Sequence, residues 1–167
     1  LCAICDGYEI SDQRIAVYGP SAEALRHAIF MRTYSSRVTA VSNTDDAPDE
    51  TTLRRARELS IVFIRHPAEL EITAHSCNVV DALGQRHEFD GIYPVLGSKA
   101  QSQLAVALGA ETDENGELRV SSDQMSTIDG VYVAGDVVSA INQIAVAVGH
   151  SSIAATAIHR KLPINSR

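Results

Sequence analysis

The sequence has no long apolar run, few cysteines and fewer basic than acidic residues, and each shortage excludes a class of protein. No apolar stretch approaches the length of about 20 residues that spans a bilayer, and no basic segment of the signal-peptide type opens the chain. The 14 Lys and Arg residues against 21 Asp and Glu residues give a net charge of −7, which disfavours nucleic acid and anionic membranes as partners. Three cysteines in 167 residues fit a reducing compartment, the cytoplasm, better than a secreted disulfide framework.

Two of the cysteines, Cys2 and Cys5, form a C-x-x-C pair that is followed directly by Asp6. Such a pair can close into a disulfide and reopen by thiolate attack. If the chain is helical from Ala3 onward, both thiols lie near a helix N-terminus, which favours the thiolate, and Asp6 is placed to carry a proton. The alternatives are a zinc half-site and two inert buried thiols. Because a closed zinc site needs four ligands and the rest of the chain offers only Cys77 and scattered histidines, we favour redox chemistry and predict no metal site.

The first part of the chain alternates apolar strands with helical periodicity. A buried strand over residues 14–18 runs through a glycine turn into a helix that reaches Tyr34, and a second strand covers 37–42. An amphipathic helix over 51–59 and a strand over 60–64 follow. Strand–turn–helix–strand units of this kind have parallel strands, so we predict an α/β, doubly wound parallel sheet.

The middle of the chain changes to short strands with a turn between them. We expect antiparallel strands over 69–75, 77–82 and 87–89, forming a meander added to the parallel sheet, and a further strand over 91–96. Cys77 falls inside this meander, and we interpret it as a packed thiol.

The last third of the sequence predicts a second set of helices, strands and turns. It comprises a short helix over 101–108, a hairpin turn at 113–116, a buried strand over 131–134 and an alanine-rich helix over 141–162. Gly135 and Asp136 end the predicted strand. An aspartate in this place can accept a hydrogen bond from a ligand hydroxyl, while the helix beyond it can point amides at an anion or a carbonyl. The alternative is that Asp136 is an ordinary helix N-cap.

The turn after the first strand occupies the place of a dinucleotide fingerprint, G-x-G-x-x-G/A. Gly19 and Ala24 fit its first and third positions, but Ser21 stands at the second and Pro20 precedes it. A side chain at the second position crowds the pyrophosphate, and proline removes one amide donor. A Rossmann-like scaffold with little or no nucleotide binding is therefore at least as well supported as a working site.

The loop after the second strand contains Asp45 and Asp46, and no Arg or Lys occurs between Arg37 and Arg54. Two carboxylates would repel a 2′-phosphate, so any nicotinamide cofactor is expected to be NADH in preference to NADPH. The interpretation that we favour for both aspartates is nevertheless that of ordinary solvated loop residues.

Taken together, these motifs resemble the thioredoxin reductases and related FAD-dependent pyridine nucleotide-disulfide oxidoreductases. The matching segments are residues 2–7 (CAICDG), 14–19 (RIAVYG), 128–136 (IDGVYVAGD) and 142–145 (NQIA, with two substitutions). The resemblance implies a pyridine-nucleotide-binding-like domain with the C-x-x-C pair over 1–93. It implies the C-terminal half of an FAD-binding domain over 94–167.

The resemblance also implies roles for individual residues. Cys5 would face the flavin as the charge-transfer thiolate, Cys2 would exchange with the partner disulfide, and Asp6 would be the general acid. The cofactor residues that it implies are Gly135, Asp136 at the ribityl chain, and Asn142, Gln143, Ile144 and Ala145 near the isoalloxazine ring. The expected cofactor of the complete protein is FAD, and the expected partner is a thioredoxin-like protein or a small-molecule disulfide. Members of the family are often homodimers.

Departures from the family pattern leave three hypotheses. The second fingerprint glycine is replaced by Ser21, and the arginine cluster that binds a 2′-phosphate is missing. Some relatives use other reductants, or run backwards as dithiol oxidases that use oxygen. We therefore expect part of an FAD-dependent disulfide reductase, with an FAD-dependent dithiol oxidase and a non-catalytic scaffold or binding module as alternatives. The start at Leu1 instead of Met leads us to expect a piece of a longer polypeptide.

Overall fold

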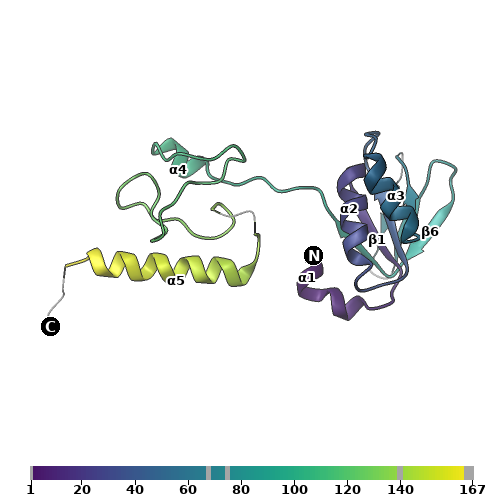
Figure 1. Cartoon of the computed structure of the whole chain (residues 1–167), viewed down its shortest axis with the longest axis horizontal. Helices are drawn as coiled ribbons and strands as arrows, with labels where there is room; N and C mark the ends of the chain where they lie inside the picture. Colours follow the sequence, from purple (N-terminus) through teal and green to yellow (C-terminus); the bar gives the residue numbers. More distant parts are fainter. Residues whose placement is uncertain (1, 67–68, 74–75, 139–140, 164–167) are drawn as a thin grey trace. The chain divides into compact units, whose positions relative to one another are not determined.

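The computed structural model describes residues 2–66, 69–73, 76–138 and 141–163. The chain divides into two compact units, Leu1–Gly97 and Ser98–Arg167, which are described one at a time (Figure 1). The sequence-based boundary lay after Tyr93, and the division between the units follows Gly97. The assignment of the units to two cofactor domains stays a prediction.

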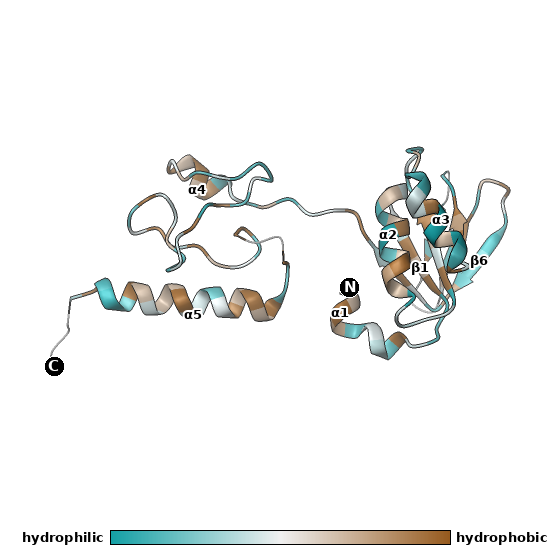
Figure 2. Cartoon of the chain, in the orientation of Figure 1, coloured by the Kyte–Doolittle hydropathy of each residue, from teal (hydrophilic) through white to brown (hydrophobic). Residues whose placement is uncertain are grey.

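The first unit is built on a four-stranded parallel sheet in the order β3-β2-β1-β7. Its strands are β1 (Ile15–Gly19), β2 (Val38–Ser42), β3 (Val62–Ile64) and β7 (Gly91–Pro94). Residues Ile15, Ala16 and Val17 of β1 are fully buried, as expected for a central parallel strand that is covered on both faces. Figure 2 shows β1 in the brown of apolar residues. The predicted α/β parallel architecture is confirmed.

The two faces of this sheet are covered by different layers. Helices α2 (Ser21–Met31) and α3 (Glu50–Glu58) pack on one face, against the side chains of Ile15 and Val17. A separate three-stranded antiparallel sheet of β4 (Glu69–Ile72), β5 (Cys77–Val80) and β6 (Arg86–Phe89) packs on the other face, against Ala16. Because successive strand residues point to opposite faces, β1 contributes to both cores. The meander is therefore a second layer and not an extension of the parallel sheet.

Helix α2 is shorter than predicted, since it ends at Met31 and not at Tyr34. The following residues form a tighter turn, in which the amide of Thr33 donates to Phe30 and that of Tyr34 to Met31. The shorter helix matters for the N-terminal segment, because this turn contains Tyr34, whose ring lies against Gly7.

The second unit contains helices α4 (Gln103–Ala107) and α5 (Ile144–Lys161), joined by turns and isolated β-bridges. The predicted turn at 113–116 is confirmed, with Gly116 at φ +81°. The buried strand expected over 131–134 is wrong, because Tyr132 forms a single bridge to Met125 and the four residues are only half-buried. An apolar segment becomes a buried strand only between neighbouring strands, and the described backbone contacts of this segment run to residues 124–128.

None of the helices in the described ranges is long and apolar enough to cross a membrane.

Candidate functional site

The C-x-x-C pair lies on a short helical turn at the start of the chain. Cys2 and Cys5 are joined in a disulfide, with their Cα atoms 5.2 Å apart. Cys2 is the cap residue of helix α1 (Ala3–Asp6), and its carbonyl accepts hydrogen bonds from the amides of Cys5 (2.8 Å) and Asp6 (3.1 Å). Cys5 is exposed and Cys2 is half-buried, so the disulfide is open to an exchange partner. The sequence predicts this placement of the two sulfurs if the chain is helical from Ala3 onward, and α1 begins at that residue.

A buried tyrosine holds the carboxylate next to the disulfide. The hydroxyl of Tyr93, on β7, donates to Oδ1 of Asp6 over 2.7 Å. Tyr93 is only 6% exposed, and its burial, followed by the hydrogen bond to Asp6, raises the pKa of its phenol well above the usual value. The phenol therefore stays protonated and keeps donating at neutral pH. Sequence reasoning named Asp6 but missed Tyr93, because no local pattern links two residues that are 87 positions apart.

Gly7 fixes the path of the chain immediately after the turn that carries Cys2 and Cys5. It begins the 3-10 turn η1 (Gly7–Ile10) and is buried. A Cβ atom at this position would lie 2.6 Å from ring atoms of Tyr34. The Tyr34 ring is itself held by edge contacts with Tyr8 and Phe30, with centroids 5.3 and 5.9 Å apart. A side chain at Gly7 would therefore push the turn that carries Cys2 and Cys5 away from the end of α2.

The three fingerprint positions are all used for internal packing. A Cβ atom on Gly19 would lie 2.6 Å from the carbonyl oxygen of Val95, and Ala24 is fully buried. Ser21 is 2% exposed, and its Oγ lies 2.6 Å from Oγ of Ser42 at the end of β2. A side chain at the second fingerprint position is expected to crowd a pyrophosphate, whereas the side chain of Ser21 points into the protein.

The group at the N-terminus of α2 is the carboxylate of Asp46. The amide of Ser21 donates to Oδ1 of Asp46 and to Oγ1 of Thr44, both over 3.2 Å. Hydrogen bonds from the Thr44 hydroxyl, and then from the amides of Ser21 and Ala22, hold the pKa of Asp46 below its usual value. The prediction of an ordinary loop residue is thus wrong for Asp46, although its side chain stays exposed. Next to Asp46, Oδ1 of Asp45 lies 3.1 Å from Nδ1 of His66.

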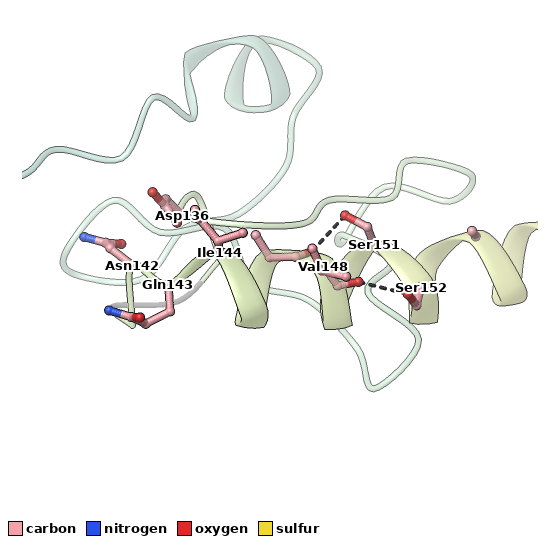
Figure 3. A pocket seen from close by; sticks show the side chains of 9 residues that line it. Asp136, Asn142, Gln143, Ile144, Val148, Ser151 and Ser152 are labelled. Atoms are coloured by element: carbon pink, nitrogen blue, oxygen red, sulfur yellow. Dashed lines mark hydrogen bonds between the residues drawn. The ribbon is translucent and has the colours of Figure 1, made fainter. Parts of the chain in front are cut away.

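The second unit brings four of the predicted cofactor residues to one hollow of about 710 Å³ (Figure 3). Its lining residues are Asp136, Asn142, Gln143, Ile144, Ala147, Val148, Ser151, Ser152 and Ala155. Gly135 and Ala145 adjoin the hollow in sequence but do not line it. Gly135 has φ +86°, a conformation that side chains rarely adopt, and it sets the turn that carries Asp136.

The hollow has a polar end and an apolar floor. Figure 3 shows Asp136, Asn142 and Gln143 at one end of the first turns of α5. The hydroxyls of Ser151 and Ser152 donate back to the carbonyls of Ala147 (2.8 Å) and Val148 (2.9 Å), so both are satisfied within the helix. Ile144 and Val148 are 85% and 59% exposed, which is high for large apolar side chains. An amphipathic ligand with a flat apolar part and hydroxyl groups fits this division.

A second, polar hollow of about 530 Å³ shares Asp136 and Asn142 with the first. Asn142 Nδ2 donates to Oγ of Ser98, another lining residue, over 3.3 Å. Asp136 therefore lies where an apolar and a polar hollow meet, and its exposed carboxylate can accept from ligand hydroxyls.

The remaining cysteine is consistent with the packing role that was predicted for it. Cys77 is a free, half-buried thiol packed against the core beneath the antiparallel sheet. In the part of the chain that the structure describes, no three His, Cys, Asp or Glu side chains are grouped so as to hold a metal ion.

With this geometry in view, the sequence matches the pyridine nucleotide-disulphide oxidoreductase family over residues 5–151. The chain belongs to this family. This oxidoreductase is 27% identical to the thioredoxin reductase of Bacillus subtilis, over 94% of the chain and 53% of that protein. It is 28% identical to the thioredoxin reductase of Mycolicibacterium smegmatis, over 93% of the chain and 53% of that protein. The chain thus spans about half the length of the curated relatives that it matches.

Solved structures give the same result for the fold. The oxidoreductase is similar to the thioredoxin reductase of Streptococcus pyogenes, with a TM-score of 0.81, 26% identity and coverage of 95% of this chain and 55% of that chain. It is also similar to the protein HlmI, with a TM-score of 0.85, 25% identity and coverage of 95% and 50%. These likenesses confirm the predicted fold class and the resemblance to thioredoxin reductases.

Proposed function

We propose that this chain carries the redox disulfide and half of the flavin site of a thioredoxin reductase-like flavoprotein. In this function, Cys2 and Cys5 pass electron pairs between FAD and the disulfide of a thioredoxin-like protein or of a small molecule. The observation that carries the proposal is the open Cys2–Cys5 disulfide, on a helical turn whose last residue, Asp6, is anchored by the buried Tyr93.

Groups on this turn account for the electrons and protons of the thiol–disulfide exchange. In the reduced pair, the thiolate of Cys2 attacks the substrate disulfide, and the first substrate sulfur leaves as a thiol after it takes a proton. The thiolate of Cys5 then attacks the Cys2 sulfur, which restores the Cys2–Cys5 disulfide and releases the second substrate thiol. The pair loses two electrons and the substrate gains two electrons and two protons. Asp6, at the end of the same turn, is the group that we assign to proton transfer.

We assign the hollow of the second unit to the FAD cofactor. Asp136 would accept from the ribityl hydroxyls, and Asn142 and Gln143 would bind polar edges of the ring system, while Ile144 and Val148 would contact its apolar face. When bound, FAD supplies the two electrons that reduce the Cys2–Cys5 disulfide. The exposed apolar floor of the hollow supports this assignment, since such side chains are normally covered by a ligand or by protein.

The test is to purify the flavoprotein from its native reading frame, measure the flavin absorbance, and replace Cys2 and Cys5 by Ser. We expect yellow protein in which the double variant keeps its flavin but loses disulfide turnover. The matched control is Cys77→Ser, which should keep both. A colourless protein, or full function in the double variant, would contradict the proposal, and the second result would favour a binding module.

Single substitutions assign the two sulfurs. The family resemblance gives the exchange with substrate to Cys2, although Cys5 is the more exposed of the two in this unit. Cys5→Ser should then trap a substrate disulfide on Cys2 as a stable mixed disulfide, and Cys2→Ser should trap none.

A dithiol oxidase is a second candidate, because Asp46 covers the N-terminus of α2, where a dinucleotide donor would bind. In this direction a substrate dithiol would reduce the Cys2–Cys5 disulfide and be oxidised to a disulfide itself. FAD, when bound, would supply the redox chemistry by which the two electrons and two protons reach O₂ and give H₂O₂. Oxygen consumption with a dithiol and without a nicotinamide cofactor would identify this function. Turnover that depends strictly on NADH or NADPH would exclude it.

A further inference from the structure

The N-terminus of α2 receives its cap from a distant loop. The first amides of a helix have no partner within the helix, and a polar side chain at the cap position usually satisfies one of them. Here the cap residue is Pro20, which makes no side-chain hydrogen bond to the helix. The carboxylate of Asp46, 25 residues after Ser21, accepts from the Ser21 amide instead.

We propose that Asp46 occupies the position of a dinucleotide pyrophosphate, and that this chain therefore does not bind NADH or NADPH on α2. In a dinucleotide-binding unit the pyrophosphate is bound by the amides at the N-terminus of the helix after the first strand. The first of these amides is that of Ser21, and it donates to Oδ1 of Asp46 over 3.2 Å. The inference rests on the proposed function and deepens it, because it removes one class of electron donor.

The loop that carries Asp46 is fixed in place by several hydrogen bonds. The Ser42 hydroxyl donates to the carbonyl of Thr44 over 2.7 Å, and the Thr44 amide donates to Ser42 Oγ over 3.1 Å. The amide of Asn43 donates to the carbonyl of Gly19 over 3.0 Å. Together with the buried contact between Ser21 and Ser42, these bonds tie the end of β2 to the start of α2. The fold thus holds the carboxylate over the helix.

The local charge also opposes a dinucleotide. A pyrophosphate would bring two negative charges to a helix terminus that already has Asp46 on it and Asp45 beside it. No Arg or Lys between Arg37 and Arg54 offsets them. The nicotinamide cofactor that the family name implies therefore does not fit the residues present at this terminus.

The experiment compares the wild-type protein with Asp46→Ala and with the matched control Asp45→Ala, which removes a neighbouring carboxylate that lies 3.1 Å from His66 Nδ1. Calorimetric titrations use NADH, NADPH and inorganic pyrophosphate as probes. We expect wild-type and Asp45→Ala proteins to bind each probe no tighter than about 1 mM, and Asp46→Ala to bind NADH and pyrophosphate about tenfold tighter. Wild-type binding of NADH in the micromolar range would overturn the proposal, as would equal affinities in all three proteins.

A second measurement does not depend on the stability of the alanine variant. Asp46→Asn keeps an oxygen that can cap the helix but cannot ionise. In the wild-type protein, the NMR shifts of the Ser21 and Ala22 amides should follow the ionisation of Asp46, and in Asp46→Asn they should not change over the same pH range. Amide shifts that titrate identically in both proteins would refute the cap.

The two proposals can fail separately. Dinucleotide binding is measured on the oxidised protein and should be the same when Cys2 and Cys5 are replaced by Ser. Tight NADH binding would overturn the cap proposal and leave the exchange chemistry intact. Absence of flavin or of cysteine-dependent turnover would overturn the proposed function, but it would leave the hydrogen bond between the Ser21 amide and Asp46 in place.

Discussion

Replacing Tyr93 with Phe removes one hydroxyl from the core of the first unit and leaves the packing of the ring in place. That hydroxyl donates to Asp6 over 2.7 Å from a residue that is 6% exposed. A hydrogen bond to a charged group contributes about 1.5–3 kcal/mol to stability. Because Asp6 is half-buried and water can replace part of the bond, we expect Tyr93→Phe to lower the free energy of unfolding by about 1–2 kcal/mol.

Urea unfolding followed by circular dichroism measures this loss. With an m-value of about 2 kcal/mol/M, the unfolding midpoint should fall by about 0.5–1 M. The matched control is Tyr18→Phe on β1, whose hydroxyl has no hydrogen bond within the described ranges, and its effect should stay within about 0.5 kcal/mol. The raised pKa of Tyr93 adds a second signature. Stability from this phenol is present below the ordinary pKa of 10.0 and is lost as the pH rises above it, and Tyr93→Phe should not show that loss.

Rates of disulfide exchange distinguish an effect of Tyr93 on the position of Asp6 from an effect on stability alone. If Asp6 transfers the proton, Tyr93→Phe and Asp6→Asn should each slow disulfide exchange, by about tenfold and by about a hundredfold respectively. The double variant should be no slower than Asp6→Asn, because Tyr93 acts only through Asp6. Additive effects in the double variant, or an unchanged unfolding midpoint in Tyr93→Phe, would refute the reasoning.

Three further substitutions test other contacts. Asp90→Asn should lower the free energy of unfolding by about 1 kcal/mol at neutral pH, after allowance for exposure, because hydrogen bonds from Arg14 lower the pKa of Asp90 to about 2. This stability is present above pH 3.8 and is lost as the pH falls through 2. The urea midpoints of variant and wild type should therefore converge at that low pH. Gly19→Ala should lower the melting temperature through a loss of about 1–3 kcal/mol, since its Cβ would meet a backbone carbonyl at 2.6 Å, and an unchanged melting curve would contradict this. Gly135→Ala should strain the turn at φ +86° by about 1–3 kcal/mol and weaken flavin retention, measured by absorbance, whereas Gly149→Ala, with open space around it, should not.

Local patterns in the sequence predicted the elements that depend on local interactions. The apolar run in β1, the turn at Gly116 and the alanine-rich composition of α5 each reflect a preference that a few neighbouring residues satisfy. The turn that carries Cys2 and Cys5 belongs to the same group, because the spacing of the two cysteines by itself allows the disulfide. These features could therefore be predicted without knowledge of the tertiary structure.

Features that depend on distant contacts could not be predicted in this way. The partner of Asp6 is 87 residues away, and the cap of α2 comes from a loop whose aspartates resemble ordinary surface residues. The segment 131–134 has the composition of a buried strand, yet its state depends on neighbouring strands that its own residues do not specify. The conflict between the charge of this loop and a 2′-phosphate stays a prediction, whereas the contact of Asp46 with the helix could be seen only in the folded chain.

The carboxylate over α2 also changes what this part of the protein needs in order to fold. A helix terminus that waits for a diffusible anion reaches its most stable form only when the anion is present. Here the chain carries its own counter-charge, so the first unit should reach full thermal stability whatever the cellular supply of nicotinamide cofactors. Addition of NADH should accordingly leave its melting temperature unchanged.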